Sequence, residues 1–451
     1  MIMEIEDRFC KVAKAFSEVL SNLQRAAERG DAVHEVEETT WSGLVETGRE
    51  MIVAYIQKQQ EEVPRPKVIE HEGKTLHRLP ERRMRPYVSA FGPTPFWRDV
   101  YAERETQRQE VVPLDAKLGM PEGNTSYLLQ KWSGTKCVKE SYEESRATLR
   151  EILGFAPSVN CLEDLVARAA EHAEVYFDQQ EAVDPTTEEE ILVATSDCKG
   201  VPMRQVDAPQ TKQADVVPRR KGKRLKKGEK NGQKRMACVG GVYSVAPFRR
   251  TADDVLNEIL RQEKQEQRPK PQNKRLRAVL TRQVGDQEVN AKDVVFDWLA
   301  YCFHREGSDA AEAFVETYLR KLLKGNVGRV IGGIRQMATK GALSKHKGEK
   351  VEQYLSYFGD RREYMKYDEY LAAGYPIGSG VVEGACRHLV KDRMEQTGMR
   401  WRIAGAQAVL NLRAIYVNDD WEPFHAHRIR AEQRKLYPYK RRLLAILNCA
   451  S

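Results

Sequence analysis

Three extended apolar runs lie between two helical parts of this chain, and they restrict its fold more than any other feature. The runs are Glu190–Ser196, Lys234–Val245 and Arg275–Thr281. Their length suits strands, and Asp197 follows the first of them directly. Between the second and third runs, Thr251 and Asp254 have the spacing of a helix capping box. The pattern predicts a domain of α/β class.

The segments outside these runs have mostly helical patterns. Residues 4–62 carry apolar residues three and four positions apart, and 292–370 is again amphipathic and helical. Between 71 and 112 the pattern is short, extended and interrupted by prolines, which indicates a small β-rich module. Helices are then expected at Tyr142–Leu153, with Gly154 as C-cap, and at Cys161–Tyr176. This pair is compatible with a DNA-binding helix-turn-helix and also with an ordinary helical hairpin.

The composition is that of a soluble globular protein. The 451 residues suit two or three domains, with 41% hydrophobic and 31% charged residues. Apolar runs are too short for a membrane helix, and the acidic N-terminus does not resemble a signal peptide, so we expect a cytoplasmic, non-membrane protein. The eight cysteines form no CxxC pair and lie at no zinc-finger spacing from histidines, which indicates reduced thiols without structural zinc.

The net charge of +8 is concentrated in two segments. Pro218–Arg235 carries +9 and Arg428–Arg442 carries +6, so the remaining 418 residues sum to −7. Concentrated basic segments on an acidic body are typical of proteins that bind a polyanion, although a solvated linker and tail would have the same composition. The DNA contacts expected in the first segment are Arg219, Arg220, Lys221, Lys223, Arg224, Lys226 and Lys227.

The most specific passage runs from Tyr375 to Trp401, YPIGSGVVEGACRHLVKDRMEQTGMRW. A glycine-rich loop is followed by helical periodicity that places Val382, Cys386, Leu389, Val390 and Arg393 on one side. Glu383, Arg387 and Lys391 are four residues apart and therefore line the opposite side. A carboxylate followed by cations on one helix face can meet a metal and a phosphate backbone together, while an exposed row of ion pairs has the same spacing.

This passage, with GAQAVLNLR after it, resembles the C-terminal catalytic block of the Kra-type insertion-sequence transposases, a DDE family. SDCKGVPM resembles the block that holds the first aspartate of that family, and KRMACVGGVYSVAPFRRTADDV resembles the segment after it. VPLDAKLGMP and the helices from Tyr142 resemble its N-terminal part, so the likeness spans about Arg83 to Phe424.

The resemblance implies an RNase H-like mixed-sheet core with a helical insertion and a mainly α N-terminal region. Asp197 matches the first catalytic Asp, and Glu383 matches the catalytic Glu. In such enzymes the carboxylates hold two Mg²⁺ ions, or Mn²⁺, which activate water or a DNA 3′-hydroxyl and stabilise the leaving oxygen. The implied partners are double-stranded DNA at insertion-sequence ends, target DNA and further copies of the chain, and a DNA-bound protein would be nucleoid-associated. Arg387, Lys391 and Arg400 are further expected DNA contacts.

The chain departs from the family at the second catalytic aspartate. The family carries it in an Asp-Gly block at the end of another core strand, whereas here VVFDWLA runs directly into YCFHREGSDAAEAF. Asp293 and Asp297 lie in a helix-like stretch, and Asp309 lies at an expected helix start, so none takes that role. A two-metal site without its bridging carboxylate should bind metal poorly. The sequence therefore predicts an internally deleted, catalytically impaired transposase whose first strand lacks its central neighbour.

Two other classes of function remain open from the sequence. The first is a non-catalytic DNA-binding remnant or repressor-like protein, whose affinity would come from phosphate neutralisation. The second is an RNA-binding protein that stacks bases on Tyr437 and Tyr439, which leaves the Tyr375–Trp401 passage unexplained. The predicted domains are a helical segment 1–70, a β-rich and helix-turn-helix-like region 71–182, a core 185–427 and a basic tail 428–451.

Overall fold

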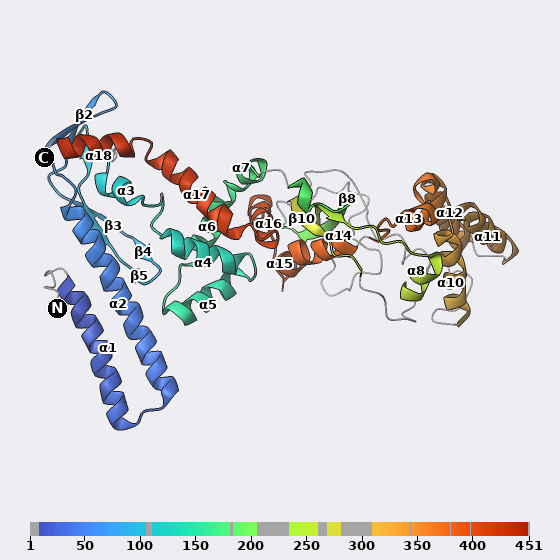
Figure 1. Ribbon diagram of the computed structural model, residues 1–451, viewed down its shortest axis with the longest axis horizontal. Helices are drawn as coiled ribbons and strands as arrows, with labels where there is room; N and C mark the ends of the chain where they lie inside the picture. Colours follow the sequence, from blue (N-terminus) through green and yellow to red (C-terminus); the bar gives the residue numbers. More distant parts are fainter. Residues whose placement is uncertain are drawn as a thin grey trace. The chain divides into compact units, whose positions relative to one another are not determined.

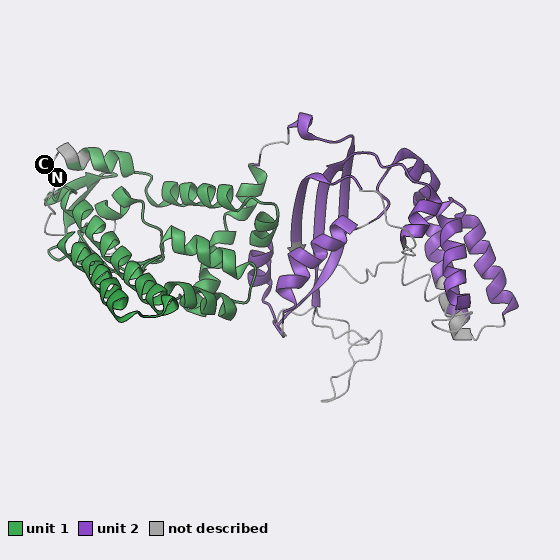
Figure 2. Cartoon of the chain, turned by 60° about the horizontal axis from the view of Figure 1, so that its bottom comes forward, with its two compact units in different colours: residues 1–179, 411–451 green, residues 180–410 purple. Residues whose placement is uncertain are grey.

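The computed structural model describes residues 9–104, 111–180, 184–204, 234–259, 268–280, 309–341, 345–378, 380–396 and 398–449. The chain divides into two compact units (Figure 2): residues 1–179 with 411–451 form unit 1, and residues 180–410 form unit 2. Both contain helices and small antiparallel sheets, so the mixed α/β class is confirmed.

Unit 1 begins with a helical hairpin, which Figure 1 shows in blue. Its helices are α1 (Cys10–Arg29) and α2 (Val33–Glu61). The chain turns between them at Gly30, whose φ of 69° is in the left-handed region that glycine adopts without strain. The predicted helical stretch 4–62 is therefore two antiparallel helices. Val19 of α1 packs where a Cβ on Gly43 of α2 would clash, which explains the close approach of the two helices.

A small β-rich module follows the hairpin, as the sequence predicts. Its strands form a three-stranded sheet of order β1-β2-β7 and two strand pairs, β3-β6 and β4-β5. The strands are β1 (Val68–His71), β2 (Lys74–Arg78), β3 (Arg83–Arg85), β4 (Val88–Ser89), β5 (Gly92–Pro93), β6 (Phe96–Arg98) and β7 (Tyr101–Ala102). Ile69 and Leu76 from β1 and β2 enter the core beneath this sheet.

Helices complete the first part of unit 1. They are α3 (Pro113–Leu118), α4 (Tyr127–Cys137), α5 (Tyr142–Leu153), α6 (Val159–Ala170) and α7 (Ala173–Asp178), with a 3₁₀ turn at Pro185–Thr187 after them in unit 2. Ser141 and Glu144 form a complete capping box that starts α5, and Gly154 ends it in the left-handed conformation. The helix expected at Tyr142–Leu153 is therefore present, and the one expected at Cys161–Tyr176 is divided into α6 and α7.

The C-terminal segment returns to unit 1 as helices. These are α16 (Ile403–Val417), whose last residues belong to unit 1, α17 (Trp421–Leu436) and α18 (Lys440–Cys449). Leu443 and Leu447 of α18 are buried in the same core as Ile69 and Leu76. Arg428, which the charge count places in the second basic segment, is buried and donates a hydrogen bond to Gln130. The basic segment is thus part of a packed fold.

Unit 2 contains a three-stranded antiparallel sheet of order β10-β9-β8. The strands are β8 (Ile191–Pro202), β9 (Lys234–Val245) and β10 (Gln272–Leu280). β9 has the predicted bounds, but β8 continues past Asp197, which pairs with Val239 in the middle of the strand. The prediction that this strand ends at Asp197 is wrong, because the polar continuation through Lys199 and Gly200 stays paired with β9.

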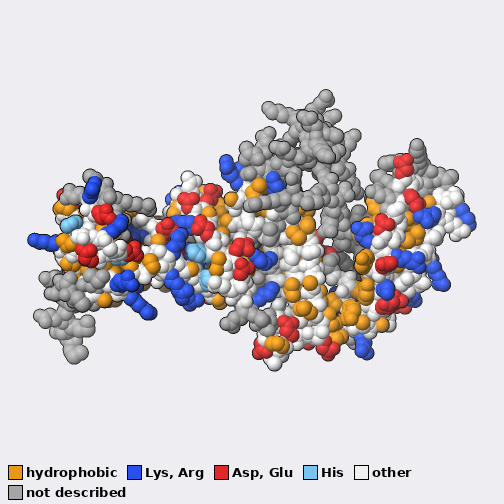
Figure 3. All heavy atoms as spheres, turned by 90° about the horizontal axis from the view of Figure 1, so that it is seen from above, with side chains coloured by type: hydrophobic (Ala, Val, Ile, Leu, Met, Phe, Trp, Pro, Cys, Tyr) orange, Lys and Arg blue, Asp and Glu red, His pale blue; other side chains and the backbone are white. Residues whose placement is uncertain are grey.

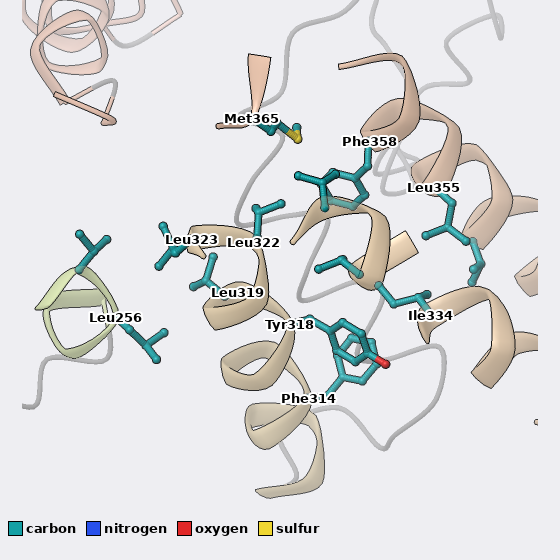
Figure 4. Close-up of a cluster of buried hydrophobic side chains, with 14 of the residues drawn as sticks. Leu256, Phe314, Tyr318, Leu319, Leu322, Leu323, Ile334, Leu355, Phe358 and Met365 are labelled. Carbon is teal, nitrogen blue, oxygen red and sulfur yellow. The ribbon is translucent and has the colours of Figure 1, made fainter. Parts of the chain in front are cut away.

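A group of helices forms a separate hydrophobic core in unit 2 (Figure 4). They are α8 (Ala252–Ile259), α10 (Asp309–Leu323), α11 (Val327–Lys340), α12 (Lys345–Asp360) and α13 (Tyr367–Ala373), with a 3₁₀ turn at Arg362–Tyr364. Leu256, Phe314 and Leu322 point into this core, as Figure 4 shows. Thr251 and Asp254 exchange the two hydrogen bonds of the predicted capping box.

The remaining helix of unit 2 follows the glycine-rich loop. It starts as α14 (Gly380–Ala385), continues as the π-helix η5 (Cys386–Lys391) and ends as α15 (Asp392–Met394). Both α14 and η5 contact β8, and α14 also contacts β9. Among the described helices of the two units, none combines the length and apolar character that crossing a membrane requires.

Candidate functional site

Asp197 faces the helix that follows the glycine-rich loop. Its Oδ2 accepts a hydrogen bond from the Cys386 thiol over 3.4 Å, and its Oδ1 accepts one from the backbone N–H of Cys198 at 2.7 Å. Its strand neighbours on this side of the sheet, Val239 and Ala278, are buried. Asp197 is therefore a partly buried carboxylate in the layer between sheet and helix.

Cys386 is held as a protonated thiol by its surroundings. Burial raises its pKa to about 12, and the charge of Asp197 and the hydrogen bond to it act in the same direction. A thiol with this pKa keeps its proton at neutral pH and donates it to the carboxylate. Cys386 thus belongs to the site as a hydrogen-bond donor, a role that the sequence showed only as a position on the buried helix face.

Glu383 lies in the first turn of α14, one helical turn before Cys386, with its side chain exposed. Because Cys386 contacts Asp197, the packing of this helix on β8 brings the two predicted catalytic segments to one place. The buried residues Val382, Leu389 and Arg393 lie on the predicted inner side, and Arg387 and Lys391 are exposed with Glu383. The assignment of helix faces made from the sequence is confirmed.

The π-helical segment changes the electrostatics of the exposed face. A π-helix brings residues five apart together, and Arg387 Nε lies 3.8 Å from Asp392 Oδ1. His388 Nδ1 lies 3.1 Å from the other oxygen of the same carboxylate. Asp392 therefore offsets part of the positive charge of this face. The four-residue spacing in the sequence did not indicate this partner.

The segment after α15 anchors the helix to the end of β8. Trp401 pairs in parallel with Met203, donating its backbone N–H to Pro202 and accepting from Arg204. Its ring lies 4.9 Å from the guanidinium of Arg393, and its indole N–H donates to the carbonyl of Met394. These contacts fix the helix that carries Glu383 relative to the strand that carries Asp197.

An ion pair joins the same helix to the start of β9. Lys234 Nζ lies 2.5 Å from Glu395, directly after α15. Lys234 is one of the cations of the first basic segment, but the structure places it in β9, where Glu395 partly neutralises its charge. Arg219, Arg220, Lys221, Lys223, Arg224, Lys226 and Lys227 lie outside the described residues.

The described residues do not complete a two-metal site. Asp293 and Asp297 lie outside them, and Asp309 begins α10 in the helical core. Within the described ranges, no three His, Cys, Asp or Glu residues gather closely enough to hold a metal ion. Asp197 and Glu383 are two carboxylates of the oxygen-ligand kind that Mg²⁺ prefers, but a third that could bridge two ions is not among the described side chains.

Two predicted nucleic-acid surfaces in unit 1 have unsuitable side chains. The exposed side of α6, the second helix of the helix-turn-helix-like pair, carries Glu163 and Asp164, which phosphates would repel. Tyr437 donates its hydroxyl to the Met120 carbonyl, and Tyr439 packs edge-on against His71 at 4.5 Å. Since burial also raises the pKa of both tyrosines, these rings are structural, and the base-stacking role predicted for them is disfavoured.

Comparison with known proteins gives no family. No protein-family model matches the chain, and no curated protein matches it. The likeness to DDE transposases therefore rests on the motifs in the sequence, and the function follows from the site as a proposal.

Proposed function

We propose that this chain is a DDE-type transposase-like protein that binds double-stranded DNA and is impaired in strand cleavage and transfer. The observation that carries the proposal is the contact between Cys386 and Asp197, which joins the Glu383 helix to β8. Two motifs separated by almost two hundred positions thereby meet, as an RNase H-like core with carboxylates on a strand and a following helix would require.

The proposed DNA contact is the exposed side of the Glu383 helix together with the first basic segment. Arg387, Lys391 and Arg400 are exposed on or directly after this helix and can meet phosphates. On the side of the molecule displayed in Figure 3, the described basic and acidic side chains are interspersed. When bound, Mg²⁺ would be held by Asp197 and would polarise a phosphodiester oxygen, while Glu383 lies on the exposed side of the helix, next to the side that carries Cys386.

Impaired chemistry follows from the carboxylate count. With only the two carboxylates that the described residues bring to the site, two Mg²⁺ ions would have too few oxygen ligands, and a leaving oxygen would be weakly stabilised. DNA binding needs no metal ligand, because phosphate neutralisation by Lys and Arg supplies the affinity. The alternative function, a non-catalytic DNA-binding protein that competes with an intact transposase, shares this binding surface and differs only in having no residual cleavage.

The test measures binding and cleavage by the purified full chain on duplexes that cover the DNA flanking its coding sequence. We expect salt-dependent binding that Asp197→Asn leaves unchanged, and Arg387→Gln with Lys391→Gln should lower the salt slope by about 0.9 for each lost phosphate contact. Lys340→Gln, which removes an exposed cation from α11, is the matched control and should bind like the wild type.

The cleavage arm uses the same duplexes with Mg²⁺ or Mn²⁺. We expect wild type and Glu383→Gln to be equally inactive or nearly so. Robust cleavage that Glu383→Gln abolishes would refute the impairment, and absence of salt-dependent DNA binding would refute the proposed function as a whole. Weak cleavage that disappears in Glu383→Gln would separate an impaired enzyme from the non-catalytic alternative.

A further inference from the structure

One side of α1 carries an apolar seam that is exposed in the described part of unit 1. Ala13, Phe16, Leu20, Leu23 and Ala27 recur at alternating spacings of three and four residues, the period of a coiled-coil seam. All five are exposed, and the three large side chains are 44–51% accessible. The side of α1 that packs on α2 is a different one and uses Val19 and Ala26. The hairpin therefore does not need this seam for its own packing.

Apolar residues of α2, in contrast, contact other parts of unit 1. Trp41 donates its indole N–H to the Ile152 carbonyl at 2.7 Å, and the ring of Phe91 lies against Gly48. By contrast, the α1 seam makes no such contact among the described residues of unit 1. A solvent-exposed row of Phe and Leu, bounded by Ala13 and Ala27 and about 21 Å long at a rise of 1.5 Å per residue, is the kind of patch that soluble proteins cover.

The seam is complementary to itself when two copies run antiparallel. With the two-fold axis between Leu20 and Leu23, each Leu20 faces Leu23 of the second copy, and each Phe16 faces the small Ala27. The residues that flank the seam on its solvent side, Ser17 and Gln24, are uncharged, so no like charges meet across it. A parallel arrangement would instead place Phe16 against Phe16.

The charges at the two ends of the hairpin favour the same orientation. Exposed Lys11 and Lys14 lie near the start of α1, and exposed Glu35, Glu37 and Glu38 lie at the opposite end, in the first turns of α2. Antiparallel pairing brings the basic end of one hairpin to the acidic end of the other, and the helix dipoles of the two α1 helices also oppose each other favourably.

We propose that the α1 seam is a homodimer interface, in which α1 of a second copy of this chain packs antiparallel on α1. The interface joins the two hairpins into a helical bundle with Leu20 and Leu23 at its centre. It does not depend on the proposed DNA binding, because assembly can be measured on the protein alone.

The experiment uses the full chain and determines its mass by sedimentation velocity at micromolar concentration, without DNA. The wild type should have twice the mass of one chain. Leu20→Glu alone and Leu23→Lys alone should each be monomeric. In either case both symmetry-related Leu20–Leu23 layers of the dimer would contain a buried unpaired charge. An equimolar mixture of the two variants should recover the dimer. In the mixed dimer the introduced carboxylate of one chain meets the introduced ammonium of the other, and the second layer keeps its leucines.

Val33→Glu is the matched control, because Val33 is 82% exposed on the same hairpin but lies outside the seam. It should remain dimeric, and helical circular dichroism should show that all variants are folded. A monomeric wild type, a dimeric Leu20→Glu protein, or a mixture that stays monomeric would each overturn the proposal.

Discussion

At the scale of single residues, several buried polar groups have environments that the sequence did not indicate. His425 of α17 is buried against Trp421, with ring centroids 4.7 Å apart, and neither ring nitrogen has a hydrogen-bond partner among the described residues. Burial, together with the nearby charges of Arg428 and Lys131, lowers its pKa to about 3. The folded protein therefore holds this imidazole neutral.

The pH dependence of stability follows from this shift. The unfolded chain binds a proton at His425 below its ordinary pKa of about 6.5, whereas the folded chain does not until about pH 3, so stability falls as pH decreases between these values. We expect the unfolding free energy of unit 1 to be about 2 kcal/mol lower at pH 5 than at pH 7 from this group. Urea unfolding at both pH values measures it.

His425→Phe should remove this part of the pH dependence, because the replacement ring cannot be protonated, and its effect at pH 7 should be small. His388→Gln is the comparison variant, since His388 is exposed in unit 2. An unchanged pH dependence in His425→Phe would show that another group causes the acid loss.

At the scale of elements, the helix from Gly380 to Met394 was predicted by its periodicity and altered by its π-helical middle. Apolar and charged residues three and four positions apart identified the two faces in the sequence, because side chains at these spacings lie on one side of a helix. The π-helix and the Asp392 contacts were not predictable, since a five-residue hydrogen-bond pattern has no clear sequence signal. The contact between Arg393 and Trp401 likewise depends on β8, because Trp401 pairs with Met203 just after that strand, far away in the sequence.

Substitution of Arg393 tests how much this contact stabilises the site. Its side chain is 0% exposed, stacks on Trp401 and donates to Met399 Sδ at 3.1 Å. Arg393→Ala should destabilise unit 2 by about 2–5 kcal/mol, because it removes the buried side chain that packs on Trp401 and leaves a cavity. Urea unfolding followed by tryptophan fluorescence measures the loss, and hydrogen exchange should accelerate at residues 398–402.

Arg387→Ala is the matched control on the same helix, because the Arg387 side chain is 71% exposed and its ion pair is a surface one. It should change stability by less than about 1 kcal/mol. Equal effects of the two substitutions would mean that the contact between Arg393 and Trp401 adds no more to the free energy of unfolding than an ordinary surface contact.

At the scale of the whole molecule, the last helix completes a core that the first part of the chain begins. Leu443 and Leu447 of α18 are buried with Ile69 and Leu114. Leu443→Ala should lower the unfolding free energy of unit 1 by about 2–5 kcal/mol, because it removes buried methyl groups and leaves a cavity. Arg442→Ala, at the exposed neighbouring position, should change it by less than about 0.5 kcal/mol.

A thermal melt of the full chain with each substitution gives this comparison. If Leu443→Ala unfolds unit 1 at the wild-type temperature, the C-terminal segment is a dispensable tail, as its basic composition alone had suggested. If the first transition shifts to lower temperature only in Leu443→Ala, residues 428–449 are a structural part of unit 1.

The sequence by itself determined the local features of this protein: the α/β class, the three strand runs, the capping box at Thr251, and the two faces of the Glu383 helix. These depend on periodicity and on residues within one turn of each other. Only the tertiary structure decided that Asp197 lies within its strand and that Cys386 donates a hydrogen bond to it. The same holds for the ion pair of Lys234 with Glu395 and the hydrogen bond of Arg428 to Gln130. Those contacts join distant segments, so burial and packing fix them, and no local spacing can.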